Sequence, residues 1–166
     1  MPEIVRRQFL REREAAQLLD EFSRKLGIDV RSLLDVKKPG IEVAEASSAE
    51  IYYANGRPII AKIKEALVPT LLFEEALLRL PKITVNMGAV PYVCNGADVL
   101  APGVVRIEGA FGADDFVVVV DERHQKPLAV AMALDDSQVV RELSRGKVAK
   151  NLHYVGDALW NLLKKG

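Results

Sequence analysis

The sequence predicts an α+β protein of two domains, a mixed N-terminal domain and a β-rich C-terminal one. Apolar residues at helical spacing and a hairpin signal occupy the first half, whereas short β-branched or apolar runs follow Pro81. With 166 residues, 49% of them hydrophobic, the chain has enough apolar surface to bury real cores. We expect the domains to comprise residues 1–81 and 82–166.

An amphipathic helix is the first predicted element, at about residues 5–26. Its apolar positions recur every three or four residues, which places them on one face: Ala15, Leu19, Phe22 and Leu26. Gly27 supplies the left-handed conformation that commonly ends a helix. The charged residues of the other face indicate solvation, and a short helix is expected at residues 31–34.

A β-hairpin follows in the first half. Asn55-Gly56 suits the positive φ angles of a type I′ turn, so residues 51–54 and 58–63 are predicted to be its strands. Helical spacing returns at residues 71–80, and Pro81 ends that helix.

The second half predicts a compact barrel or sandwich. Four runs carry this pattern, separated by Gly, Pro and Asp: ITVNMGAVPYVCNG, VVRIEGAF, DFVVVVDE and PLAVAMALD. One helix interrupts them, capped by residues 135–137 and ended by Gly146, with Val139, Val140 and Leu143 facing inward. The last strand is expected at residues 151–155, and Asp157 is expected to cap a final helical turn.

Composition excludes several classes of function. Lys plus Arg balance Asp plus Glu at 23 each, so the chain as a whole does not attract nucleic acid or membranes. Cys94 is the only cysteine, which excludes an internal disulfide and a multi-cysteine metal site. No run approaches 18 apolar residues and the N-terminus lacks a signal peptide, so we expect a cytoplasmic protein without a membrane.

Signatures of catalysis are weak. The sequence has no phosphate-binding glycine loop, and His124 and His153 lack the spacing of metal ligands, so no cofactor and no metal are expected. Cys94 is expected to be a small core residue in an apolar strand. Four carboxylates are expected to mark strand ends and to discourage edge pairing: Asp114, Asp115, Asp121 and Glu122. No catalytic residue is predicted.

A basic cluster stands out within this neutral chain. Residues 141–150 hold four basic side chains against the single acidic Glu142: Arg141, Arg145, Lys147 and Lys150. His153 and Tyr154 follow directly. Cations for phosphates beside an aromatic ring favour binding of single-stranded RNA, whereas a solvated helix end gives the same composition.

Three segments, in order, resemble the PUA domain, the RNA-binding module named for pseudouridine synthases and archaeosine transglycosylases. They are NGADVLAPGV (95–104), PLAVAMALDDSQV (127–139) and GKVAKNLHYVGDALW (146–160). The junction at residues 67–104 is similar to that of the malignant-T-cell-amplified-sequence family, in an archaeal-type form. This resemblance implies an N-terminal α/β domain followed by a C-terminal PUA β pseudo-barrel.

The resemblance also implies a role in translation without catalysis. The expected partners are structured RNA, namely rRNA of the small ribosomal subunit and tRNA, in initiation or recycling, with a possible separate translation-factor partner. Three alternatives stay open: an accessory protein in tRNA or rRNA modification, a protein–protein adaptor that uses the hairpin at Asn55-Gly56 as a binding edge, and a stand-alone enzyme.

The family surface maps onto two stretches of this sequence. One side is implied at Asn95, Gly96, Ala97, Asp98, Ala101, Pro102 and Gly103. The other side is implied at Arg141, Arg145, Lys147, Lys150, Asn151 and His153. At Gly96 the missing side chain permits close approach of a ribose or phosphate, although a turn glycine is the alternative. Strand alternation exposes one of His153 and Tyr154, and Trp160 is expected in the core.

Overall fold

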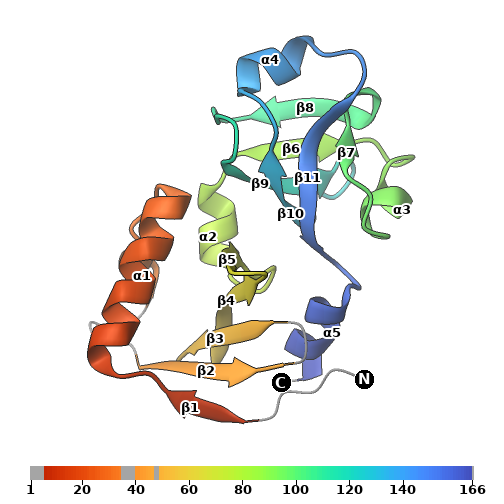
Figure 1. The fold of residues 1–166 in the computed structure, drawn as a ribbon. Coiled ribbons are helices and arrows are strands. Elements are labelled where there is room, and N and C mark those ends of the chain that lie inside the picture. The colour runs from red at the N-terminus through yellow and green to blue at the C-terminus, as the bar shows by residue number, and fades with distance from the viewer. Residues whose placement is uncertain (1–5, 35–39, 47–48, 166) are drawn as a thin grey trace. The chain divides into compact units, whose positions relative to one another are not determined.

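The computed structural model describes residues 6–34, 40–46 and 49–165, and the chain forms two compact units (Figure 1). One unit comprises Met1–Arg79 together with Asn161–Gly166, and the other comprises Leu80–Trp160. The domain boundary between residues 81 and 82 stays a prediction. The α+β fold class is confirmed, since both units combine helices with an antiparallel or mixed sheet.

The first unit contains a five-stranded antiparallel sheet whose strands follow each other in chain order. The strands are β1 Arg7–Phe9, β2 Ile41–Glu45, β3 Glu50–Ala54, β4 Arg57–Ile63 and β5 Ala66–Pro69. The helices of this unit are α1 Glu12–Leu26, η1 Val30–Leu33 and α2 Glu74–Arg79.

Helix α1 presents the predicted apolar stripe, because Ala15, Leu19, Phe22 and Leu26 are all buried. Its predicted start was wrong: the helix begins at Glu12, and residues 7–9 pair with β2 instead. The Glu14 carboxylate accepts a hydrogen bond from the Arg11 backbone N–H, which satisfies a donor at the helix start.

The β3–β4 hairpin is confirmed. Asn55 and Gly56 have φ angles of 52° and 80°, as a type I′ turn requires. Both strands are interior to the sheet, with β2 on one side and β5 on the other, so the expectation of a free binding edge there was wrong. Helix α2 begins later than predicted, because residues 71–73 lie in a turn in which the Phe73 N–H donates to the Thr70 carbonyl.

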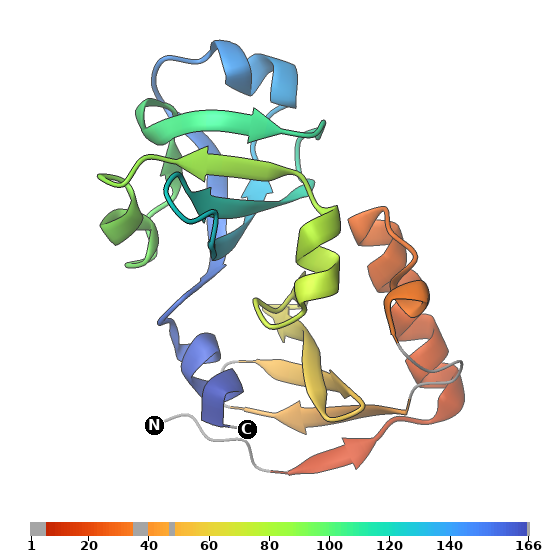
Figure 2. The ribbon, with the colours of Figure 1, turned by 180° about the vertical axis from the view of Figure 1, so that it is seen from behind.

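The second unit contains a six-stranded sheet in the order β7-β11-β10-β9-β6-β8, curled around its core (Figure 1; Figure 2). Neighbouring strands are antiparallel except β6 and β9, which run parallel. The strands are β6 Lys82–Val85, β7 Val99–Leu100, β8 Val104–Glu108, β9 Phe116–Asp121, β10 Pro127–Ala133 and β11 Lys147–Tyr154. The helices of this unit are α3 Val90–Val93, η2 Ala101–Gly103 and α4 Ser137–Glu142, and α5 Ala158–Lys165 crosses the division between the units, since Asn161–Gly166 belongs to the first.

The curled sheet confirms the predicted barrel-like second half. All six residues of β9 are buried, which explains why its valine run shows no polar alternation. Val117 and Val119 belong to the core cluster, together with alternate residues of β6 and β10.

One of the predicted strand runs is broken. After β6 the chain turns at Asn86, whose side-chain Oδ1 accepts a hydrogen bond from the Ala89 N–H at 2.9 Å, and it continues as α3. Pro91 fits the first turn of this helix, where its missing N–H costs nothing. Cys94 therefore follows a helix rather than lying in a strand, although it packs against the core as expected.

Helix α4 has one inward apolar position instead of three. Val140 is buried, whereas Val139 and Leu143 are 40% and 38% exposed, because a six-residue helix turns only one position toward the core. The Asp136 side chain makes no capping hydrogen bond, and Ser137 Oγ accepts one from the Phe111 N–H.

The chain end is organised by Asp157. Its carboxylate accepts hydrogen bonds from the backbone N–H groups of Tyr154 and Trp160, so the predicted cap of α5 is confirmed. Leu159 is buried, but Trp160 is only half-buried, which corrects its expected place in the core.

Asp121 ends strand β9 as predicted, but β9 is interior to the sheet, so Asp121 does not discourage edge pairing. It is buried at the end of β9, and its carboxylate accepts backbone N–H bonds from His124 and Lys126 across the following turn. These bonds hold the pKa of Asp121 below its ordinary value, and the bond from the His124 N–H contributes most.

Among the described residues, no helix combines the length and the apolar character needed to cross a membrane.

Candidate nucleic-acid interface

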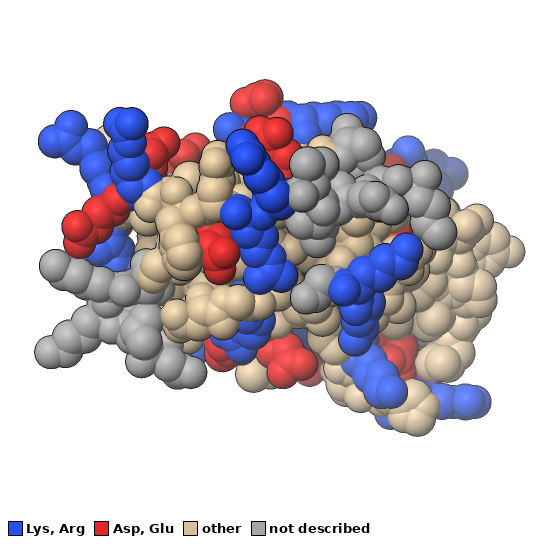
Figure 3. Space-filling model, turned by 90° about the horizontal axis from the view of Figure 1, so that it is seen from below, with Lys and Arg blue, Asp and Glu red and all other residues tan. Residues whose placement is uncertain are grey.

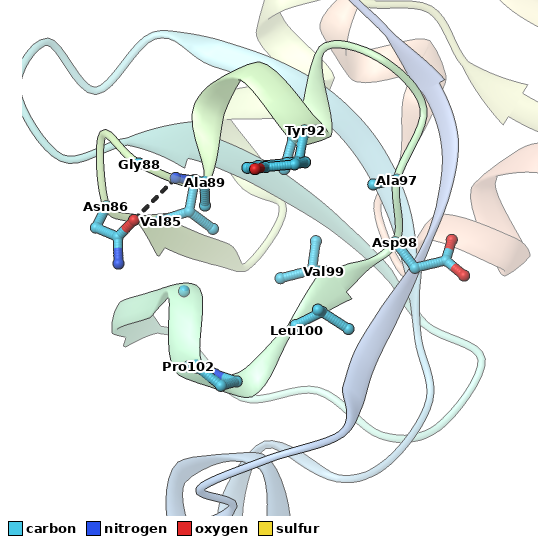
Figure 4. A pocket seen from close by; sticks show the side chains of 12 residues that line it. Val85, Asn86, Gly88, Ala89, Tyr92, Ala97, Asp98, Val99, Leu100 and Pro102 are labelled. Atoms are coloured by element: carbon cyan, nitrogen blue, oxygen red, sulfur yellow. Dashed lines mark hydrogen bonds between the residues drawn. The ribbon is translucent and has the colours of Figure 1, made fainter.

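A pocket of ≈ 310 Å³ opens beside α3 in the second unit (Figure 4). The turn after β6 and helix α3 form one wall, and the segment from β7 through η2 forms the other. Backbone pairing joins the two walls, because the Asn86 N–H donates to the Gly103 carbonyl. The lining is mainly apolar: Val85, Ala89, Tyr92, Val93, Val99, Leu100 and Pro102.

Two large apolar side chains remain exposed at this pocket. Tyr92 is 69% exposed and Leu100 is 50% exposed. Figure 4 shows the Tyr92 ring on the α3 side of the pocket, with Leu100 and Pro102 facing it from the other side. An exposed ring and an aliphatic side chain across a shallow pocket suit a planar ligand that stacks, such as an unpaired nucleobase.

The loop after α3 is held by Asn151 of β11. The Asn151 Nδ2 donates to the carbonyl oxygens of Val93 and Ala97, both at 3.0 Å. Its backbone N–H donates to Asp98 Oδ1 at 2.9 Å. Residues 93–98 are therefore fastened to a strand more than fifty positions later in the chain.

Asp98 carries the only carboxylate that lines the pocket. Its side chain points away from the cavity toward β11, where Oδ2 lies 3.1 Å from Lys147 Nζ. The Asn151 N–H lowers the pKa of Asp98 most, and Lys147 and Lys150 lower it further. Asp98 is thus a stable anion between two lysines.

The basic cluster reaches the pocket through strand pairing. Lys147 lies opposite Leu100 in the β7–β11 ladder, and the Ala101 N–H donates to the Gly146 carbonyl. Lys150 is also exposed, three residues after Lys147 on β11. The structure therefore brings the predicted stretches 95–103 and 146–151 together, with cations beside an apolar pocket.

None of the four predicted cations lines the pocket itself. Arg141 is exposed on α4, and its Nη2 donates to the Gly109 carbonyl at 3.2 Å. Arg145 is exposed in the loop before β11.

Among the uncharged predicted residues, Asn95 and Ala97 are exposed in the loop after α3, Pro102 is exposed on η2, and Gly103 lies at the pocket.

Burial contradicts two predicted contacts, His153 and Ala101, and two others, Asn151 and Gly96, already have a role in the fold. His153 has no exposed surface, and its Nδ1 lies 2.9 Å from Asp157 Oδ2, so it cannot touch RNA in this conformation. The Asn151 amide is occupied by two carbonyls, and Ala101 is buried. At Gly96, φ is +94°, and a Cβ would lie 3.2 Å from the Tyr154 ring, so the fold itself requires glycine.

The prediction also missed pocket residues, above all Tyr92. The run around Pro91 and Tyr92 was interpreted as a strand, because four helical residues are too few to display a 3.6-residue period. The proline before Tyr92 is the one signal of a helix start there. Leu100 fell inside the resemblance, but its exposure depends on the strands around it.

Charge elsewhere is mixed. On the face drawn in Figure 3, Lys and Arg side chains are separated by Asp and Glu side chains and by uncharged surface, in keeping with the neutral composition.

Within the described ranges, no three His, Cys, Asp or Glu side chains group closely enough to hold a metal ion. Burial raises the pKa of the Cys94 thiol, which disfavours the reactive thiolate.

Two family models cover most of the chain. The PUA domain matches residues 81–155, and a domain of unknown function, DUF1947, matches residues 6–78. An uncharacterized protein of Methanocaldococcus jannaschii is 35% identical, over 96% of this chain and 98% of that one.

Relatives with descriptive names are more distant. Translation machinery-associated protein 20 of Eremothecium gossypii is 29% identical, over 88% of this chain and 84% of its own. Malignant T-cell-amplified sequence 1-A of Xenopus laevis is 28% identical, over 88% and 83%.

Solved structures share the whole fold. A hypothetical protein from Pyrococcus horikoshii has a TM-score of 0.80 and 32% identity, covering 95% of this chain and 99% of that one. A PUA-domain structure from Aeropyrum pernix has a TM-score of 0.84 and 25% identity, covering 98% and 92%.

Proposed function

Because the chain belongs to the PUA-domain family of the malignant T-cell-amplified sequence and translation machinery-associated 20 proteins, we propose that it binds the small ribosomal subunit or tRNA during initiation or recycling. The family is RNA-binding and associated with translation. The finer assignment, to the subunit or to tRNA, is the proposal. It includes binding without catalysis and the possible help of a separate translation-factor partner.

One observation carries the proposal: an exposed aromatic ring stands at an apolar pocket, and a lysine lies on the strand that pairs with the β7 wall of that pocket. Tyr92 stands at the pocket wall, and Lys147 lies opposite Leu100 in the strand ladder that borders it. A base stacked at Tyr92 would leave its phosphates within the field of Lys147 and Lys150. Stacking and phosphate contacts are the two interactions that single-stranded RNA offers every protein, whatever its sequence.

The contact residues proposed for RNA follow from exposure. They are Tyr92, Ala97, Leu100, Pro102 and Gly103 at the pocket, and Asn95, Arg141, Arg145, Lys147 and Lys150 outside its lining. Asp98, Gly96 and Asn151 are proposed to hold the loop after α3 in place rather than to contact RNA. The pocket is small and its only carboxylate turns away, which favours recognition over chemistry.

Co-sedimentation tests the proposal. The purified protein is mixed with small ribosomal subunits from its own source, or with free tRNA, at about 50 mM and about 150 mM salt. Salt-sensitive pelleting with the subunits supports the translation role, because phosphate contacts release counter-ions.

The other outcomes separate the alternatives. Binding to free tRNA but not to subunits moves the assignment to tRNA, and subunit-independent stimulation of a tRNA-modifying enzyme would make the protein an accessory in modification. Absence of binding to either RNA, with the Tyr92→Ala variant behaving identically, contradicts RNA binding and leaves a protein adaptor.

A further inference from the structure

Asn151 is a polar side chain placed where β11 passes the loop after α3. Its Nδ2 has two hydrogens, and both are used, one on the Val93 carbonyl and one on the Ala97 carbonyl. Its Oδ1 is buried and accepts no hydrogen bond from any residue that the structure describes. The Asn151 amide therefore bonds to the loop through both of its donors, while its oxygen is buried away from solvent.

The two carbonyls belong to the segment that positions Tyr92. Within that segment, the backbone N–H groups of Asn95 and Ala97 donate to the Tyr92 carbonyl, and the Gly96 N–H donates to the Val93 carbonyl. The end of α3 and the loop therefore move together, and Asn151 ties both to the sheet. A four-residue helix has too few internal hydrogen bonds to fix its own orientation.

The backbone of Asn151 adds a third tie. Its N–H donates to Asp98 Oδ1, while Asp98 Oδ2 faces Lys147. One residue of β11 thus determines where the loop carbonyls, the Asp98 carboxylate and the neighbouring cation lie. Removing the amide takes the donor from the Ala97 carbonyl and leaves the Val93 carbonyl with its bond from the Gly96 N–H, and it leaves the Asp98 contact in place.

From this geometry we infer that Asn151 is a positioning residue: its carboxamide fastens the loop 93–98 to β11 and so holds Tyr92 at the pocket in the orientation that RNA requires. The inference rests on the proposed RNA binding at this pocket. It assigns Asn151 no contact with the RNA, because its donors are already used and its oxygen is buried.

Two variants test the clamp. Asn151→Ala removes both donors, and Asn151→Asp keeps the size of the side chain but turns an acceptor toward the two carbonyls. Asn161→Ala, an exposed amide on α5, is the matched control for losing a carboxamide. If Asn151→Ala fails to fold because of the space it leaves, the isosteric Asn151→Asp still tests the donors.

The first measurement needs no RNA. Hydrogen exchange of peptides that cover residues 93–98 should accelerate about tenfold or more in both Asn151 variants, while exchange in β9 and β10 stays slow. Unchanged exchange in this loop, with the variant folded, overturns the clamp.

The second measurement is affinity for a ten-nucleotide single-stranded RNA over a series of salt concentrations. Asn151→Ala should bind about tenfold more weakly, with the same slope of log affinity against log salt as the wild type, since it changes no charge and loses no phosphate contact. Lys147→Ala should reduce that slope, which distinguishes a contact residue from a positioning one.

The measurements distinguish a failure of the proposed RNA binding from a failure of the positioning role of Asn151. If the wild type binds neither this RNA nor ribosomal subunits, the proposed function fails, and loop exchange still reports on the clamp. If the wild type binds and the Asn151 variants bind equally well despite a loosened loop, the proposed function stands and the positioning role is overturned. A lower salt slope in Asn151→Ala, which changes no charge, also overturns it.

Discussion

Lys147 Nζ lies 3.1 Å from Asp98 Oδ2, so a cation of the candidate RNA surface carries its own counter-ion in the free protein. The lysine side chain is 62% exposed and the aspartate 26% exposed. An exposed pair of this kind contributes about 0–1 kcal/mol to stability. An RNA phosphate can therefore draw Lys147 away from Asp98 at little cost, while Asp98 keeps its bond to Asn151.

Replacing Lys147 and Lys150 with Ala should weaken RNA binding and leave the melting temperature almost unchanged. Each lost phosphate contact should reduce the salt slope by about 0.7 for single-stranded RNA. Titration of a labelled oligonucleotide at several salt concentrations measures both quantities. Lys126→Ala, an exposed lysine in the β9–β10 turn, is the control. An unchanged slope in the double variant would place the RNA elsewhere.

Tyr92→Ala should reduce the affinity for single-stranded RNA by about 1–3 kcal/mol through lost stacking. Tyr92→Phe should bind nearly as well, because the ring rather than the hydroxyl is proposed to act. Folding should be unaffected, since the side chain is 69% exposed. Val139→Ala on α4, where Val139 is 40% exposed, removes an exposed apolar group away from the pocket as a control. Equal affinity of Tyr92→Ala and wild type, measured by the same titration, would remove the pocket from the proposal.

Gly96→Ala should lower the free energy of unfolding by about 1–3 kcal/mol, because its φ of +94° strains an L-residue and the new Cβ meets the Tyr154 ring at 3.2 Å. Gly146→Ala is the matched control. Its φ is +93° and nothing lies within 4 Å, so it carries the backbone strain alone. Urea unfolding of both variants separates the two costs. A Gly96→Ala protein as stable as wild type but defective in RNA binding would restore the close-approach role of Gly96.

Asp98 should make stability depend on pH in the acid range. The pKa of Asp98 is lowered in the folded protein, first by the Asn151 N–H and then by Lys147 and Lys150. Its stabilising effect is therefore present above the unfolded-state pKa of about 3.9 and is lost as pH falls through the folded pKa. Asp98→Asn should be less stable than wild type at pH 7, and the difference should shrink below about pH 4. Urea unfolding at several pH values checks this, and a constant difference would contradict it.

Local patterns predicted the elements whose signal is contained in a few neighbouring residues. Asn55-Gly56 predicted the hairpin because its two positive φ angles are a property of those residues themselves. The stripe from Ala15 to Leu26 predicted α1 because about three turns are enough to display its period. The start of α1 was missed, since residues 7–9 become a strand only by pairing with β2.

The sequence predicted the two stretches that form the candidate site, but not which of its side chains are exposed. The stretches around Gly96 and Lys147 were both identified, and the β7–β11 pairing brings them together. Tyr92 was missed because α3 is only four residues long. His153 was included because alternation says that one of two neighbours is exposed, without saying which one.

The sequence by itself determined two β-containing halves, the hairpin, the main helix and the cations of the surface, because these depend on short-range conformational preferences and on charge. Only the tertiary structure decided that His153 is buried against Asp157, that Asn151 fastens a loop more than fifty residues earlier, and that Tyr92 stands open at a pocket. These features depend on which strands pair and on what covers each face, and hydrogen bonds between distant segments leave no periodic pattern in the chain.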